Sequence, residues 1–191
     1  MKQTTAKEGR CQWANSSPAM RDYHDHEWGV PSHDDRHLFE MLILEGAQAG
    51  LSWATILNRR AGYRHAFASF DPAKVAAFDD RRLERLREDD GIIRTRLKIY
   101  STRTNAQAVL RVQAEFGSFA TYLWNWVDGT RIVHHPRTLA ELRPTTGLSD
   151  RISRDLKRRD FTFVGSTIVY SLLEAVGIVD DHLTSCPFKR E

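Results

Sequence analysis

The sequence predicts an all-α fold in a single domain. Apolar side chains recur at helical spacing over most of the 191 residues, and strands are hard to find beyond a weak pattern at residues 130–135. Hydrophobic residues make up 41% of the chain and include nine Phe and five Trp, which is enough for a sizeable core. No internal repeat or low-complexity linker divides the chain. We therefore expect one helical domain at residues 10–191 after a disordered polar tail at residues 1–9.

The first two thirds of the chain predict a series of helices. Residues 34–49 place apolar side chains at helical spacing from Leu38 to Gly46, and Asp34 or Asp35 can cap the start. Further helices are expected at residues 52–68, 70–78, 80–88, 94–116 and 118–127.

Turn signals separate these helices. Pro72 suits the first turn of the helix at 70–78. The Asp90-Gly91 pair breaks the pattern before the long helix, and Asp128-Gly129 turns the chain ahead of the weak strand.

The most regular pattern lies at about residues 149–176. A basic helix begins there with Ser149 or Asp150 as its cap. A short hydrophobic connector ends at Gly165, and a second helix runs from there to a stop at Gly177. This helix–hairpin–helix pattern can present the backbone N–H groups of its second helix to a phosphate. An ordinary αα-hairpin is an equally good interpretation from the pattern alone.

The distribution of basic residues favours a polyanionic partner. The net charge is only +3, but the pI is about 9.0 and the basic residues are clustered. Further clusters lie at 81–87 and 94–103, and the cluster at 81–87 is equally well explained as a solvated helix face balanced by nearby Asp and Glu. The cluster at 151–159 has less acidic balance and belongs to the hairpin. The expected nucleic-acid contacts there are Lys157, Arg158, Arg159, Val164, Gly165, Ser166 and Thr167.

Composition excludes several classes of protein. The chain has no apolar run long enough for a membrane span and begins without the apolar stretch of a signal peptide, so we expect a cytoplasmic protein. Its two cysteines cannot hold a four-thiolate iron–sulfur cluster. In a cytosolic chain they are better explained as thiols or metal ligands than as a disulfide.

A metal site is suggested by DHLTSC at residues 181–186, which places His182 four residues before Cys186. Cys11 is the other thiol, and His24 and His26 lie nearby in the sequence. A Cys2His2 set would enclose Zn²⁺ without an open position, so such a site would be structural. The alternative is that the cysteines are small buried side chains and the histidines are scattered.

Several long motifs occur together in the order typical of one family. They are CQW at 11–13, YHDHEWG at 23–29, LFEMLILEGAQAGLSW at 38–53, FDPAKVA at 70–76, GIIRTRLKI at 91–99, RRDFTFVGSTIVYS at 158–171 and DHLTSC at 181–186. From about residue 10 to residue 187 the sequence resembles the DNA-3-methyladenine glycosylase I family. The resemblance implies an all-helical, helix–hairpin–helix glycosylase that is monomeric and acts on alkylated double-stranded DNA. It also implies one structural Zn²⁺ per chain, held by Cys11, His24, His182 and Cys186, which joins the N- and C-terminal segments.

The resemblance also assigns a base pocket. A flipped N3-methylated adenine is a flat cation, which needs aromatic faces and an accepting group. Glu45 lies in an otherwise apolar stretch, where a carboxylate is costly unless it is paired or functional. The resemblance makes it the catalytic residue, with Tyr23, Trp53, Trp13 and Trp28 around the base. The residues alone allow other interpretations. Glu45 can be a carboxylate at a helix end that bonds backbone or Arg, and Trp53 can be a core residue. Tyr23 can simply pack against the neighbouring metal ligand.

The loop that follows is predicted to contact the DNA where the flipped nucleotide leaves a gap in the stack. Gln48, Gly50 and Leu51 precede Trp53, and Leu51 is expected to act as an apolar wedge where the nucleotide has left the stack. The alternative is a buried Leu at the start of the next helix.

Two further positions bear on the mechanism. Relatives that also cut the strand carry Lys two residues after the last Gly of the hairpin, where this chain has Thr167, so we expect base release by water without strand cleavage. Many relatives use an Asp downstream of the hairpin to activate that water. Asp180 is a candidate, but the spacing is short and we prefer a surface carboxylate at the end of a helix.

Two rival functions remain open. A non-catalytic DNA-binding module would use the hairpin without needing Glu45, Tyr23 or Trp53. A zinc hydrolase or deaminase would need an open position on the metal and an HxE…PCxxC pattern, which the chain lacks.

Overall fold

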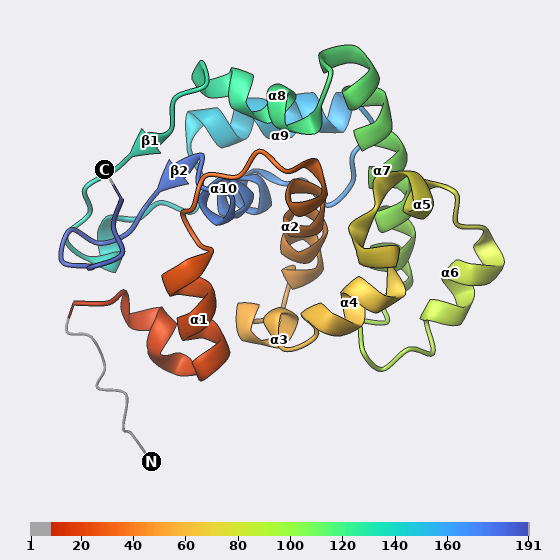
Figure 1. Ribbon diagram of the computed structural model, residues 1–191, viewed down its shortest axis with the longest axis horizontal. Helices are drawn as coiled ribbons and strands as arrows, with labels where there is room; N and C mark the ends of the chain where they lie inside the picture. Colours follow the sequence, from red (N-terminus) through yellow and green to blue (C-terminus); the bar gives the residue numbers. More distant parts are fainter. Residues whose placement is uncertain (1–8, 191) are drawn as a thin grey trace.

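Two helices, α2 (Asp35–Gln48) and α10 (Ser166–Ala175), pack against each other at the centre of the computed structural model (Figure 1). The structure describes residues 9–190. The predicted polar tail therefore lies outside the described residues except for Gly9. Among residues 9–190, no helix is long and apolar enough to cross a membrane.

The architecture is mostly helical, as predicted. The other α-helices are α1 (Pro18–His26), α3 (Trp53–Leu57), α4 (Arg60–Ala66), α5 (Pro72–Ala76), α6 (Asp80–Leu86), α7 (Arg96–Phe116), α8 (Phe119–Trp124) and α9 (Gly147–Arg158). Single 3₁₀ turns lie at Gln12–Ser16, Ala68–Phe70, Asn125–Val127 and Leu139–Glu141. The weak strand pattern forms β1 (Ile132–Val133), which pairs in parallel with β2 (Val179–Asp180). No pattern in the sequence predicted β2.

Helix α2 begins where its predicted cap lies, because the Asp34 side chain accepts a hydrogen bond from the Arg36 backbone N–H at 3.0 Å. Every residue from Leu38 to Ala47 is buried. A helix that is buried on all sides lies in the core. Its two carboxylates, Glu40 and Glu45, are therefore buried as well.

Helix α9 begins earlier than the sequence predicted. Its cap is Thr146 and not Ser149 or Asp150, because Thr146 and Ser149 form a reciprocal capping box. The connector that follows is fixed to α7, since the Asn105 side chain donates to the Thr162 carbonyl at 3.0 Å and accepts from the Thr162 N–H at 2.8 Å. The connector also reaches α2, where a Cβ added at Gly46 would lie 3.2 Å from the Phe163 Cβ.

The single helix predicted at 52–68 is wrong. The chain forms α3, breaks at Asn58-Arg59, forms α4 and then makes a 3₁₀ turn in which Ala68, Ser69 and Phe70 have positive φ. Arg60, the first residue of α4, makes tertiary contacts just after this break. Helix α1 also went unpredicted, although its Ser17 cap and Pro18 are ordinary helix-start signals.

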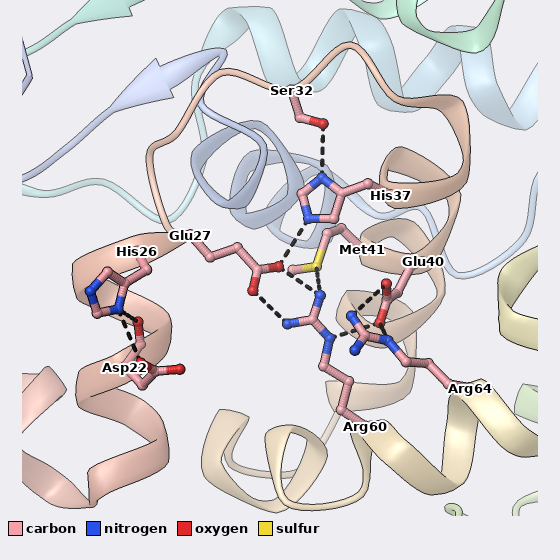
Figure 2. A network of polar contacts seen from close by, with 9 residues as sticks. All are labelled: Asp22, His26, Glu27, Ser32, His37, Glu40, Met41, Arg60 and Arg64. Atoms are coloured by element: carbon pink, nitrogen blue, oxygen red, sulfur yellow. Dashed lines mark hydrogen bonds and ion pairs between the residues drawn. The ribbon is translucent and has the colours of Figure 1, made fainter.

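Arg60 bonds two carboxylates from different parts of the chain, buried Glu40 and half-buried Glu27 (Figure 2). Its guanidinium donates two hydrogen bonds to Glu27, at 2.6 and 2.7 Å, and one to Glu40 of α2, at 2.7 Å. His37 contacts Glu27 from the other side at 2.9 Å, and Arg64 shares Glu40. This Arg60 network joins α4, α2 and the end of α1.

The two ends of the described chain meet. The Ser185 hydroxyl donates to the Gly9 carbonyl, and the Lys189 amine donates to the His134 carbonyl beside β1. Helix α1, the 3₁₀ turn before it and the C-terminal segment after β2 therefore lie together on one side of α10 (Figure 1). Both predicted halves of the metal site are in this region.

Candidate functional site: a base-sized cavity beside a Cys–His cluster

A cavity of about 260 Å³ lies between α1, α2, α3 and α10. All five residues of the predicted base pocket line it, and they come from four separate segments of the chain. The lining residues are Trp13, Met20, Tyr23, Trp28, Glu45, Gln48, Trp53, Leu142, Ser171 and Glu174. The structure thus brings together the side chains that the sequence predicted as one site.

Glu45 projects into this cavity from the last turns of α2. It is only 5% exposed, and among residues 9–190 no side chain or backbone group hydrogen-bonds its carboxyl. The alternative of a helix-end carboxylate bonded to backbone or Arg is therefore wrong. Burial raises the pKa of Glu45 to about 8, because no nearby cation or donor compensates for the lost water.

Aromatic rings form the walls around Glu45. The ring centroids of Tyr23 and Trp53 lie 5.3 Å apart, and Trp13 packs edge-on against Trp28 at 5.0 Å. The indole N–H of Trp53 is buried without a hydrogen-bond partner among the described residues. An unpaired donor and an unpaired carboxyl in one cavity are costly in a purely structural site, which favours a ligand that pairs them.

A second hollow of about 200 Å³ adjoins the first and shares Glu45, Gln48 and Ser171 with it. The loop after α2 forms one side and the first turn of α10 the other. In this loop Gly50 has a φ of +79°, and the Leu51 side chain is 41% exposed. The alternative of a buried Leu51 at a helix start is therefore wrong, because the next helix begins only after the Ser52 cap.

The predicted hairpin contacts differ in their surroundings. Gly165 caps α10, Ser166 bonds Ser149 at 2.8 Å and exposed Thr167 lines the second hollow. Val164 is buried and its carbonyl accepts from Ser153.

The basic end of α9 is partly committed to carboxylates. Arg159 is bound by Glu115 at 2.6 Å and by Asp155 at 2.7 Å, and Arg158 also contacts Asp155. Lys157 is exposed and takes part in no ion pair among the described residues.

Three metal-binding side chains meet where the chain ends converge. Cys11, His24 and Cys186 each bring one donor atom into a group within 4.8 Å of one another, and all three are buried. The Cys186 sulfur lies 3.6 Å from His24 Nε2. The hydrogen bond from the Cys11 thiol outweighs burial and lowers the pKa of Cys186 to about 3, so a thiolate is available there.

His182 packs against this cluster, with its ring centroid 4.9 Å from that of His24. Its Nε2 is buried and lacks a hydrogen-bond partner among the described residues, while its Nδ1 lies 2.9 Å from Asp180. Asp25 holds His24 Nδ1 in the same way at 2.8 Å. A carboxylate on one ring nitrogen is the usual arrangement when the other nitrogen ligates a metal. Three of the four predicted ligands, Cys11, His24 and Cys186, thus form one group that could hold a metal ion, and His182 packs beside it without belonging to that group.

Asp180 is buried and not a surface carboxylate, which corrects our preferred interpretation. Its oxygens contact His182 at 2.9 Å and accept from Arg131 at 2.7 Å. Burial raises the pKa of Asp180, but the contacts with His182 and the backbone N–H of Arg190 lower it to about 2. It also does not line the cavity that holds Glu45. Its place in the fold is to orient His182.

Four residues that line the cavity were not predicted from the sequence. They are Met20, Leu142, Ser171 and Glu174. Glu174 had the same signal as Glu45, a carboxylate within an apolar helical stretch. Leu142 had none, because its segment reaches the cavity from an irregular loop.

Comparison with known proteins places the chain in a family. The family model for methyladenine glycosylase matches residues 13–190. The chain belongs to the methyladenine glycosylase family. DNA-3-methyladenine glycosylase 1 of Escherichia coli (strain K12) is 46% identical over 177 residues, which cover 93% of this chain and 95% of the relative. DNA-3-methyladenine glycosylase of Haemophilus influenzae (strain ATCC 51907 / DSM 11121 / KW20 / Rd) is 39% identical over 180 residues, with coverage of 94% and 97%.

Solved structures of this family have the same fold. A crystal structure of 3-methyladenine DNA glycosylase I is 45% identical, covers 95% of this chain and 100% of its own, and superposes with a TM-score of 0.92. The Staphylococcus aureus protein, solved to explain its recognition of 3-methyladenine, is 36% identical, with coverage of 96% and 97% and a TM-score of 0.93. These matches confirm the predicted family and its enzyme class, a glycosylase that hydrolyses N-glycosidic bonds.

Proposed function

We propose that this glycosylase takes N3-methylated adenine out of double-stranded DNA into the cavity around Glu45 and releases it by hydrolysis. The observation that carries the proposal is the Glu45 carboxyl, buried and unbonded in a cavity walled by Tyr23 and Trp53. The relatives support this substrate. Two relatives are named as DNA-3-methyladenine glycosylases, and the Staphylococcus aureus structure addresses the recognition of 3-methyladenine.

The cavity suits the charge of this substrate. An N3-methylated adenine in DNA carries a delocalised positive charge, which aromatic faces and a carboxylate stabilise. Glu45 ionises more readily once that cation enters, because the cation offsets the lost water. When the bond from sugar C1′ to the base breaks, its electron pair stays with the base and neutralises the charge. Water adds its oxygen to C1′ and releases a proton.

The reaction is proposed to end with base release. Strand cleavage in this superfamily needs an amine to form a covalent intermediate with the sugar, and the position that would supply it is Thr167. Thr167 lines the second hollow, where the sugar of the flipped nucleotide would lie. A hydroxyl there cannot form that imine, so the product is an intact strand with an abasic site.

Two surface features are proposed to hold the DNA. The exposed Leu51 fills the space that the flipped nucleotide leaves in the stack. The connector and first turn of α10, with Lys157 beside them, meet the phosphates as a helix–hairpin–helix. Asn105 and Gly46 fix the connector next to the Leu51 loop, so both features face one duplex.

The buried cluster is proposed to hold a structural Zn²⁺ through Cys11, His24, His182 and Cys186. Two thiols and two imidazoles are a ligand set that zinc prefers, and four protein ligands leave no position for a reacting water. Trp13 and Trp28 lie between this cluster and the cavity, and the Trp28 ring meets the His182 ring edge-on with their centroids 4.4 Å apart. The metal would thus shape the aromatic wall without taking part in the chemistry.

A non-catalytic DNA-binding module is the rival that an experiment must exclude. We would incubate the protein with methylated duplex DNA and separate the released bases by chromatography. The expected result is free 3-methyladenine and no strand break before alkali. Binding of DNA without any released base would establish the rival.

Variants locate the chemistry in the same assay. Glu45→Gln should lower the rate about 100-fold or more, which is typical for a lost charge contact in a transition state. Glu88→Gln, on the exposed face after α6, is the matched control and should be unchanged. Leu51→Ala should lose more activity on duplex than on single-stranded substrate, because only the duplex has a stack to fill.

A further inference from the structure

The Leu51 loop, residues 49–52 between α2 and α3, is held from outside by one side chain. Lys98 lies in the first turn of α7, and its ammonium donates to the Ala47 carbonyl at 2.8 Å and to the Ala49 carbonyl at 2.7 Å. Among residues 9–190, no other hydrogen bond joins residues 49–51 to an element other than α2. Lys98 therefore ties this loop to α7.

Lys98 completes the hydrogen bonding at the C-terminal end of α2. The last carbonyls of a helix have no partner within it and need one from elsewhere. The Ala49 N–H bonds the Gly46 carbonyl at 3.4 Å, and the Leu51 N–H bonds the Gln48 carbonyl at 2.6 Å. Lys98 binds the two carbonyls that alternate with these. Backbone and Lys98 together thus fix the turn that leads to Leu51, and a cation is favourable at this end of a helix.

The turn has little else to hold it. Gly50 has a φ of +79°, and a Cβ added there would meet nothing within 4 Å. Glycine has the widest choice of backbone conformations, and no neighbouring atom restricts it at this position. The Leu51 side chain is 41% exposed, so its packing also restrains the loop only in part. The position of Leu51 therefore depends on the bonds that Lys98 makes.

Lys98 differs from the other basic residues of the 94–103 cluster. Arg96 bonds Glu84 at 3.1 Å, and Arg103 bonds Asp80 at 2.7 Å. Lys98 is half-buried and, within the described part of the chain, forms no ion pair that competes for its ammonium. Hydrogen bonds from an ammonium to carbonyl oxygens are charge-assisted and stronger than neutral ones. This amine is thus committed to the end of α2.

We propose that Lys98 is a positioning residue for base flipping, because its ammonium holds the Leu51 loop in the conformation from which Leu51 enters the DNA stack. The inference rests on the proposed function and adds to it the residue that sets the wedge. A loop that is ordered before it meets the duplex loses less conformational entropy on binding. Without Lys98, this entropy loss would oppose the opening of the stack.

The first test needs no DNA and follows hydrogen exchange of the Leu51 backbone amide by NMR. In Lys98→Met we expect this amide to exchange about 10-fold or more faster, because a charge-assisted bond that holds the loop closed is lost. Lys98→Arg keeps the charge and two donors, so it should retain most of the protection. Lys74→Met, at a lysine of α5 that is 70% exposed, is the matched control and should be unchanged. An unchanged Leu51 amide in Lys98→Met would overturn the inference.

The second test asks whether Lys98 acts through Leu51. We would measure kcat/KM for base release from methylated duplex DNA in Lys98→Met, in Leu51→Ala and in the double variant. Lys98→Met should lose about 10-fold when Leu51 is present. Once Leu51 is replaced by Ala, the same change should cost less than about twofold, because the loop then carries no wedge to position. Lys98→Arg should recover most of the activity.

Equal losses from Lys98→Met with and without Leu51 would overturn the inference. Lys98 would then support the fold in general or contact the DNA itself, and a change in Tm or in the salt dependence of binding would tell which. Failure of the proposed function looks different, since the wild type itself would release no base. The exchange rate of the Leu51 amide would still report whether Lys98 holds the loop.

Discussion

At the scale of single residues, the site depends on leaving one carboxyl without a partner. Among residues 9–190 the other buried carboxylates are paired, as Glu40 is by Arg60 and Asp180 is by Arg131. Glu45 is the contrast, because burial alone acts on it and raises its pKa to about 8. A group kept in this state destabilises the folded protein at neutral pH and gains its partner only when a cationic base arrives.

Replacing Glu45 by Gln should therefore stabilise the protein in a pH-dependent way. A carboxyl whose pKa is about 8 when folded and 4.5 when unfolded favours the folded state less and less as pH rises between these values. The neutral amide of Glu45→Gln escapes this loss. We expect the variant to unfold at the same denaturant concentration as the wild type below pH 4.5 and to be more stable by on the order of 2–4 kcal/mol near pH 8.

Urea unfolding at several pH values measures this difference, with Glu88→Gln as an exposed control. A constant difference across the pH range would contradict the desolvated state of Glu45.

The two carboxyls of the cavity show what could be read from the sequence at this scale. Glu45 was predicted because a charge in an apolar stretch is costly and because the motif around it is distinctive. Glu174 lies in an equally apolar stretch but outside the positions that the resemblance assigned. Asp180 was misjudged, since its burial depends on His182 and Arg131, which no local pattern connects to it.

At the scale of elements, the cavity is kept open by helices that fix one another at their ends. The Arg60 network joins α4 to Glu27, the residue before Trp28, and to α2 five residues before Glu45 (Figure 2). It therefore sets the separation of two cavity walls, although none of its members lines the cavity.

Arg60→Met should remove the cation that the two carboxylates share, leaving half-buried Glu27 with His37 alone and buried Glu40 with Arg64 alone. We expect a loss of about 3 kcal/mol in the free energy of unfolding, as for other buried pairs with one partner removed. Thermal unfolding of this variant, with the exposed Arg85→Met as control, measures the change. An equal effect of both variants would show that the network contributes no more than a surface charge does.

Helix interiors were predictable, whereas helix breaks were not. Local periodicity and capping residues were enough for α2, α7 and α10. Just after the break between α3 and α4, Arg60 contacts Glu27, 33 positions away in the sequence, and a local sequence window cannot contain such a contact. The strand β2 is short and pairs with a distant segment, which also leaves no periodic signal.

At the scale of the whole molecule, the chain ends form part of the site. Cys11 and Cys186 are 175 positions apart but belong to one buried cluster, and the aromatic wall of Trp13 and Trp28 packs on it. A metal bound by both cysteines would close a long loop of the chain and so lower the entropy of the unfolded state. The cluster therefore affects global stability and the shape of the cavity together.

Removal of the proposed zinc should lower stability before it affects chemistry. We expect a chelator that strips the metal, or the His24→Ala substitution, to lower Tm by on the order of 10 °C, because the ligands would be left buried and unpaired. His26→Ala is the matched control, since His26 lies two residues away with its side chain 73% exposed, and its Tm should not change.

Activity measured below the lowered Tm separates the two possible roles of the metal. If Zn²⁺ is structural, base release per folded molecule stays within about threefold of the wild type, because four protein ligands leave no position for substrate or water. A complete loss of activity in protein that keeps its helical signal and its Tm would show that the metal takes part in the reaction. Metal analysis identifies the side chains that hold the zinc. We expect one zinc per chain in the wild type and in His26→Ala, and none in Cys186→Ala.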